Sequence, residues 1–144
     1  MQQTIEEIQQ EIVEEFEMFP EWQDKYEYLI QLGKELDPMP TNTQIDENKV
    51  KGCQSNVWVN AEFNDGKLFF TGDSDALIVK GLVALVLRVF TGNNPDEILN
   101  AQPHFIADIG LANHLSPTRS NGLAAMVKQI KFYALAYKTK AGLA

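Results

Sequence analysis

The segment from Asp75 to Phe90 restricts the fold most, because it is apolar around nearly the whole circumference of a helix. A helix of this kind must be covered on all sides, so the rest of the chain has to pack around it. Ser74 can cap its first turn, where Asp75 adds a favourable negative charge, and Gly92 follows its end. With 144 residues the chain is long enough for a real core. We therefore predict a central buried helix packed on a sheet.

The sheet is predicted from the segment just before that helix. Apolar and polar residues alternate from Val57 to Phe63, the period of a half-buried strand. Asn64-Asp65-Gly66 is typical of a hairpin turn, and Lys67 to Thr71 then forms the returning strand. Asn48 to Lys51 can form a short third strand. The sequence thus predicts a small antiparallel sheet of two or three strands.

Helices account for most of the remaining chain. Ile5 to Phe16 has the apolar spacing of an amphipathic helix, and Thr4 with Glu7 forms a capping box. The other predictions are a helix over Glu21 to Gly33 that stops at Gly33, a loop over Leu36 to Thr43, a short helix from Asn94-Pro95, one or two short helices over Pro103 to Leu115, a long helix opening at Ser116-Pro117, and a frayed tail over Lys138 to Ala144. Together these elements predict one α+β domain over residues 1–144.

Charge is spread unevenly along the chain, which has a net charge of −8. Residues 1–37 carry 11 acidic and 2 basic side chains, whereas residues 117–144 carry 5 basic and no acidic ones. The overall acidity argues against nucleic acid as a ligand, because phosphate binding needs a concentrated basic face. No apolar run is long enough to span a membrane, and the acidic N-terminus does not resemble a signal peptide. A cytoplasmic location without membrane contact is expected, and the acidic surface either is simply solvated or helps to select a basic protein partner.

Cys53 is the only cysteine. It therefore cannot form an intramolecular disulfide, and alone it cannot build a cysteine-rich zinc site or hold an iron–sulfur cluster. Lys49 and Lys51 would favour its thiolate if their ammonium groups came close. Gly52 leaves room beside the sulfur for another protein's sulfur to approach. A nucleophilic or sulfur-carrying role and an inert buried role both remain open on these residues alone.

Other chemistry has weaker support. A Cys–His hydrolytic dyad would need His104 or His114, and no known motif surrounds the cysteine. Neither Gly92-Asn93-Asn94 nor Asn121-Gly122 forms a nucleotide-binding fingerprint. The start of the last helix, which includes Arg119, can bind an anion or a loop backbone, or it is merely a well-capped helix end. Asp73-Ser74-Asp75 raises the same choice between a helix cap and a polar contact near the cysteine.

Three motifs stand out in the chain: Val50-Lys51-Gly52-Cys53-Gln54-Ser55-Asn56-Val57-Trp58, then Gly72-Asp73-Ser74-Asp75-Ala76-Leu77-Ile78-Val79-Lys80-Gly81-Leu82, and His114-Leu115-Ser116-Pro117-Thr118-Arg119-Ser120-Asn121-Gly122-Leu123. In order and spacing they resemble the SufE family of sulfur-acceptor proteins, and the resemblance covers about residues 4–137. The segment from Trp22 to Gly33 matches the family in character more than in detail.

The resemblance implies a fold similar to the iron–sulfur scaffold proteins of the IscU type and a sulfur-carrying role. Cys53 would accept the persulfide sulfur of a SufS-like cysteine desulfurase, stimulate that enzyme, and pass the sulfur to an iron–sulfur scaffold such as SufBCD. No cofactor or metal of its own is expected. The residues expected to support the loop or contact the partner are Lys51, Gly52, Gln54, Ser55, Asp75 and Arg119. We expect the loop to rest against the protein when free and to swing out about Gly52. The alternatives are a thiol-dependent enzyme acting on a small molecule and a non-catalytic interaction module.

Overall fold

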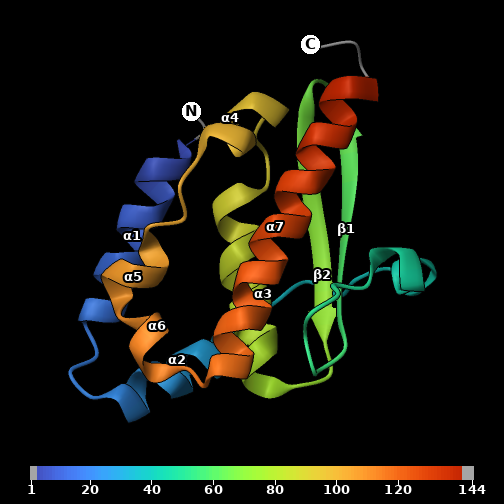
Figure 1. Cartoon of the computed structure of the whole chain (residues 1–144). Coiled ribbons are helices and arrows are strands. Elements are labelled where there is room, and N and C mark those ends of the chain that lie inside the picture. Colours follow the sequence, from blue (N-terminus) through green and yellow to red (C-terminus); the bar gives the residue numbers. More distant parts are fainter. Residues whose placement is uncertain (1–2, 141–144) are drawn as a thin grey trace.

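In the computed structural model, which describes residues 3–140, the predicted apolar helix is the centre of the molecule. Helix α3 (Leu77–Phe90) contacts α1, α2, α7 and both strands. Figure 1 shows the β-hairpin on one side of α3 and α1 on the other, with α7 running alongside. The prediction of a central buried helix on a small antiparallel sheet is confirmed, and the fold class is α+β. The prediction of one domain over residues 1–144 stays a prediction.

The start of α3 differs from the sequence prediction. Ala76, not Ser74, is the N-cap, and the helix begins at Leu77. Ser74 belongs to the second strand, where it pairs with Val57, so strand pairing takes the residues that were expected to begin the helix. The Ser74 hydroxyl instead accepts a hydrogen bond of 3.3 Å from the Ala76 backbone N–H. Asp75 therefore lies in the turn between strand and helix.

The sheet has two strands within the described residues, β1 (Val57–Asn64) and β2 (Lys67–Ser74), which pair antiparallel along their full length. The turn between them has φ of 53° at Asp65 and 78° at Gly66, the left-handed geometry that such a hairpin needs. Of the two options that the sequence left open, the structure has the two-stranded one, because Asn48 to Lys51 does not form a third strand. That segment contributes one isolated bridge, Lys49 to Trp58, after a 3₁₀ turn.

The outer edges of both strands are covered by other parts of the chain. On β1, the hydroxyl of Tyr133 donates to the Val59 carbonyl oxygen at 2.8 Å, and that of Tyr137 donates to the Ala61 carbonyl oxygen at 3.4 Å. On β2, the Leu68 N–H donates to the Asn93 carbonyl oxygen at 2.9 Å. Backbone groups that a sheet edge normally leaves open thus have partners on both sides.

The other helices follow the predicted order. They are α1 (Ile5–Glu17), α2 (Trp22–Lys34), α4 (Pro95–Asn100), α5 (Phe105–Ile109), α6 (Leu111–His114) and α7 (Pro117–Lys140), with 3₁₀ turns η1 (Thr41–Thr43) and η2 (Asp46–Asn48). The predicted capping box of Thr4 and Glu7 is present. The predicted fraying from Lys138 is wrong as far as Lys140, which is still helical; the rest of that tail lies outside the described residues. No helix within residues 3–140 is both long and apolar enough to cross a membrane.

Gly33 does not end α2, contrary to the sequence prediction; the helix continues to Lys34. Gly33 instead faces Gly81 where α2 crosses α3. A Cβ at Gly33 would lie 2.8 Å from the Gly81 backbone nitrogen, and a Cβ at Gly81 would lie 2.2 Å from the Leu29 carbonyl oxygen. The two glycines therefore allow the backbones of α2 and α3 to touch.

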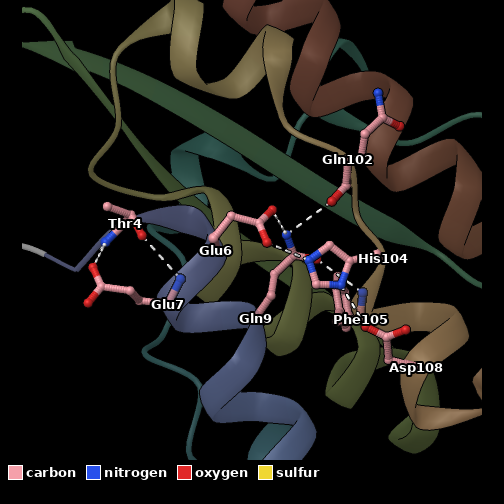
Figure 2. A network of polar contacts seen from close by, with 8 residues as sticks. All are labelled: Thr4, Glu6, Glu7, Gln9, Gln102, His104, Phe105 and Asp108. Carbon is pink, nitrogen blue, oxygen red and sulfur yellow. Dashed lines mark hydrogen bonds and ion pairs between the residues drawn. The ribbon is translucent and has the colours of Figure 1, made fainter.

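A polar network joins α1 to the segment that leads into α5 (Figure 2). The buried side chain of Gln9 donates to the Gln102 carbonyl oxygen and accepts from the Phe105 N–H, both at 3.0 Å. Beside it, the His104 ring lies between Asp108, at 2.6 Å from Nδ1, and Glu6, at 2.7 Å from Nε2. The hydrogen bonds to Asp108 and then to Glu6 raise the pKa of His104 above its usual value.

This network predicts a pH-dependent part of the stability. Because the folded-state pKa of His104 lies above the unfolded one, its stabilisation is fully present below the unfolded value of about 6.5 and is lost as pH rises through the folded pKa. His104→Gln should therefore lower the free energy of unfolding more at about pH 5.5 than at about pH 8.5. The side chain is 37% exposed, so the difference should not exceed about 1 kcal/mol. Urea unfolding at both pH values measures it.

The control for this prediction is Asp108→Asn, which removes the carboxylate that accounts for the largest part of the shift. In that background the substitution of His104 should show less pH dependence. Equal losses of stability at the two pH values in the otherwise unchanged protein would contradict the assignment.

Candidate functional site

The Cys53 loop, residues 49–56, connects η2 to β1. Its first part is anchored by the Val50 N–H, which donates to the Val57 carbonyl oxygen at 2.8 Å. Gly52 has φ of 95°, a conformation that other residues rarely adopt, and the chain turns there to bring Cys53 against α7. The thiol is half-buried and donates to the carbonyl oxygen of Gly122, with the sulfur 3.6 Å from that oxygen.

A cavity of about 670 Å³, which we call the Cys53 cavity, lies beside the thiol where the first turns of α3 and α7 meet α2. Its apolar wall comes mostly from α2, α3 and α7, and its polar wall from the Cys53 loop and the start of α7. The lining residues include Ile30, Cys53, Gln54, Ser55, Leu77, Ile78, Leu82, Ser116, Thr118, Arg119, Gly122 and Met126. The structure therefore brings together Cys53, Gln54, Ser55 and Arg119 from the predicted set.

Asp75 is not among the residues that line this cavity, but it holds the far end of the Cys53 loop. Its carboxylate accepts from the Asn56 backbone N–H at 3.1 Å and from the Asn56 side-chain amide at 2.7 Å. In return the Asp75 N–H donates to the Asn56 carbonyl oxygen at 3.3 Å. The loop is thus tied to the β2–α3 turn three residues after the cysteine.

Lys51 does not line the Cys53 cavity. With Lys49, Lys128 and Phe132 it lines a separate hollow of about 350 Å³ between η2, the Cys53 loop and α7. Burial raises the pKa of the Cys53 thiol, and no lysine contributes to the shift, so the condition under which Lys49 and Lys51 would favour the thiolate is not met in this resting arrangement. In this position the sulfur is a protonated thiol at neutral pH, sheltered rather than activated.

Arg119 is exposed in the first turn of α7, where its backbone N–H donates to the Ser116 hydroxyl at 3.3 Å. Within residues 3–140 its guanidinium makes no ion pair. The start of α7 is fixed from α2: the Tyr26 hydroxyl donates to the His114 carbonyl oxygen, and the Trp22 ring stacks on the His114 ring with centroids 3.7 Å apart. Arg119 is therefore held at the cavity with its charge available to a partner.

A hydrolytic dyad and a metal site find no support in the described part of the chain. His114 stacks on Trp22, and His104 pairs with the carboxylates of Asp108 and Glu6. The hydrogen bond of the Cys53 thiol goes to the Gly122 carbonyl oxygen and not to a histidine. No group of three or more metal-ligating side chains gathers among residues 3–140.

Sequence reasoning missed Leu77 and Gly122 as site residues, although both line the Cys53 cavity. Leu77 is 64% exposed although it begins the most apolar helix of the chain. Gly122 stands out in the sequence only as a glycine near a helix start. The signal that could have found it is its position inside a helical pattern, where glycine is unfavourable and needs a packing reason.

Three comparisons with known proteins bear on the family and the fold of the chain. The profile of the SufE family, described as an Fe–S metabolism associated domain, matches residues 10–134. A SufE-like protein of Rhizobium meliloti is 44% identical over 84% of this chain and 90% of its own length, and one of Synechocystis is 42% identical over 88% and 80%. The solution structure of a hypothetical protein from Thermus thermophilus has a TM-score of 0.76 at 22% identity, covering 92% of this chain and 96% of its own, which supports the fold. The family profile, which covers most of the chain, and the two relatives show that the chain belongs to the SufE family and has a role in Fe–S metabolism.

Proposed function

We propose that this protein is a sulfur carrier that accepts persulfide sulfur on Cys53 from a SufS-like cysteine desulfurase and delivers it for iron–sulfur cluster assembly. It acts as an accessory protein that stimulates the desulfurase, in the reducing environment of the cytoplasm, where a single free cysteine is expected. A scaffold complex such as SufBCD is the proposed recipient. The association of the SufE family with Fe–S metabolism supports this proposal.

The observation that carries the proposal is the placement of the single cysteine at the wall of the Cys53 cavity. A carried sulfane sulfur must be protected from other thiols, and a second cysteine nearby would release it by forming a disulfide. Cys53 has no such neighbour in the sequence, and the cavity beside it has room for an additional sulfur atom. Half-burial of the thiol also limits access by small reductants.

The transfer step is a thiol–persulfide exchange. The Cys53 thiol loses its proton to solvent or to a base of the partner, and its thiolate attacks the outer sulfur of the desulfurase persulfide. The new S–S bond forms on Cys53 as the old one breaks, and the partner's cysteine leaves as a thiolate. No oxidant or reductant is consumed. Because burial raises the thiol pKa, the exchange requires Cys53 to leave its resting position first.

A flexible point before the cysteine and an anchor after it define how the loop can move. Gly52, with its positive φ, lies immediately before the cysteine, and the Asn56–Asp75 hydrogen bonds hold the chain three residues after it. Movement between these points would swing Cys53 away from α7 without disturbing β1. Docking of the desulfurase against the cavity rim supplies the free energy for this movement in our proposal.

Mass spectrometry of the Cys53 peptide tests the proposal directly. The protein is incubated with a SufS-like desulfurase and free cysteine, digested without reductant, and compared with a sample that lacks the desulfurase. We expect one added sulfur atom on the Cys53 peptide only when desulfurase and cysteine are both present. Stimulation of the desulfurase without any sulfur on Cys53 would refute the carrier role, and absence of both would favour an unrelated interaction module.

We predict that two residues at the Cys53 cavity contact the desulfurase, the apolar Leu77 and the charged Arg119. Leu77→Ser and Arg119→Ala should each raise the concentration needed for half-maximal stimulation about fivefold, which corresponds to about 1 kcal/mol of binding. Leu135→Ser is the matched control, because Leu135 is 53% exposed farther along α7 and is not part of the cavity. If the control weakens stimulation as much as Leu77→Ser, the docking surface is elsewhere.

A further inference from the structure

We propose that Gly122 is a positioning residue that creates the resting place of the Cys53 sulfur on α7. Because residue 122 has no side chain, the sulfur can lie where even a Cβ at that residue would be only 3.2 Å away, and the backbone carbonyl oxygen of the same residue accepts a hydrogen bond from the thiol. The inference adds to the proposed sulfur-carrier function, and its relevance to sulfur transfer rests on that proposal. Its test needs no desulfurase.

Among the described residues, Cys53 limits the space beside Gly122. A Cβ at residue 122 would lie 3.2 Å from the Cys53 sulfur and 3.9 Å from the Cys53 Cβ, and these are the contacts within 4 Å outside the neighbouring helix backbone. Gly33 and Gly81 differ, because a Cβ at either would meet the backbone of another helix. Packing between secondary-structure elements therefore explains those two glycines but not Gly122.

Glycine at this position is unfavourable for the helix itself. Gly122 lies within α7, which runs from Pro117 to Lys140, and is buried there. Glycine inside a helix is less favourable than alanine because its backbone loses more freedom on folding. The cysteine is thus the one described neighbour that benefits from the missing methyl group.

The contact with Gly122 also favours the protonated form of the sulfur. The carbonyl oxygen 3.6 Å away is an acceptor, so it can bind a thiol but repels a thiolate. The raised thiol pKa agrees with this arrangement. Filling the space at residue 122 should push Cys53 outwards, where water can solvate its thiolate.

Alkylation of Cys53 by iodoacetamide in the free, folded protein tests the inference. Gly122→Ala should react about threefold faster than the unchanged protein and Gly122→Val about tenfold faster, corresponding to about 0.7 and 1.4 kcal/mol. The pH profile of the reaction should shift towards lower pH in the same order. Asn121→Ala and Asn121→Val are the matched controls, since Asn121 is the exposed neighbour on the same turn of α7. The inference is overturned if the Gly122 variants react like the unchanged protein, or if the Asn121 variants react as fast as the Gly122 variants.

Thermal unfolding gives a second, independent readout. In a Cys53→Ala background no sulfur competes for the space, so Gly122→Ala should show the full helix-stabilising effect, a rise in Tm of about 2–4 °C. With Cys53 present the rise should be smaller, because the new methyl group displaces the sulfur. Equal shifts of Tm in the two backgrounds would contradict the inference even if Cys53 carries sulfur as proposed.

Discussion

Cys53→Ser is expected to abolish sulfur acceptance from a cysteine desulfurase and to remove the stimulation of that enzyme. A serine hydroxyl is close in size to a thiol, so the loop should still rest on α7. Its oxygen does not ionise near neutral pH and cannot hold a sulfane sulfur through thiol–persulfide exchange. Desulfurase turnover with the variant should therefore fall to that of the enzyme alone, and sulfur loading should drop at least about a hundredfold.

A thiol moved by two residues provides the control for this result. Ser55 also lies on the Cys53 loop and lines the same cavity, so Ser55→Cys in the Cys53→Ser background places a thiol close to the original position. We expect this double variant to regain less than about a tenth of the stimulation, because the exchange requires the sulfurs to align. Persulfide detected on the carrier in the Cys53→Ser variant alone would remove the basis of the proposed function.

Gly81→Ala, which adds one methyl group, is expected to lower the free energy of unfolding far more than the same change at Gly122. The new Cβ would lie 2.2 Å from the Leu29 carbonyl oxygen and 2.8 Å from the Leu29 backbone carbon, so the crossing of α2 and α3 would have to open. Overpacking against backbone cannot be relieved by a side-chain rotation. The free energy of unfolding should fall by about 3 kcal/mol or more, measured by urea unfolding followed by circular dichroism.

Gly122→Ala is the matched control for Gly81→Ala, because both add one methyl group to a buried helix glycine. At residue 122 the methyl group meets a side chain on a loop, not a helix backbone, so the fold should keep its stability. A loss below about 1 kcal/mol for Gly81→Ala would show that the two helices can separate easily.

The elements that local patterns control could be predicted from the sequence. The capping box of Thr4 and Glu7, the Asn64-Asp65-Gly66 turn and the burial of the apolar helix each depend on residues close together in the chain. The errors came from contacts between distant segments. Ser74 pairs with Val57 in the sheet, so it does not cap the helix as predicted. Gly33 is needed where α2 crosses α3 at Gly81, and not to end α2.

The candidate site was predictable only in part for the same reason. Cys53 stood out by its uniqueness, and the predicted residues Asp75 and Arg119 lie close to the loop and the cavity, although their roles stay predictions. The sequence indicated that lysines beside the cysteine would favour its thiolate only if their ammonium groups came close. The fold instead turns the sulfur towards Gly122 of α7, and burial raises its pKa. Side-chain direction on a loop with a left-handed glycine is not encoded in any local pattern.

The covered edges of the hairpin have a consequence for how concentrated protein behaves. An uncovered strand in a two-stranded sheet is a template onto which a second chain can add a strand, and that is a common route to fibrils. Here the hydroxyls of Tyr133 and Tyr137 donate hydrogen bonds to carbonyl oxygens of β1, while Asn93 pairs with Leu68 of β2. These contacts come from α7 and Asn93, outside the Cys53 loop, so the movement that we propose for that loop would leave them in place and would not open these parts of the hairpin to self-association.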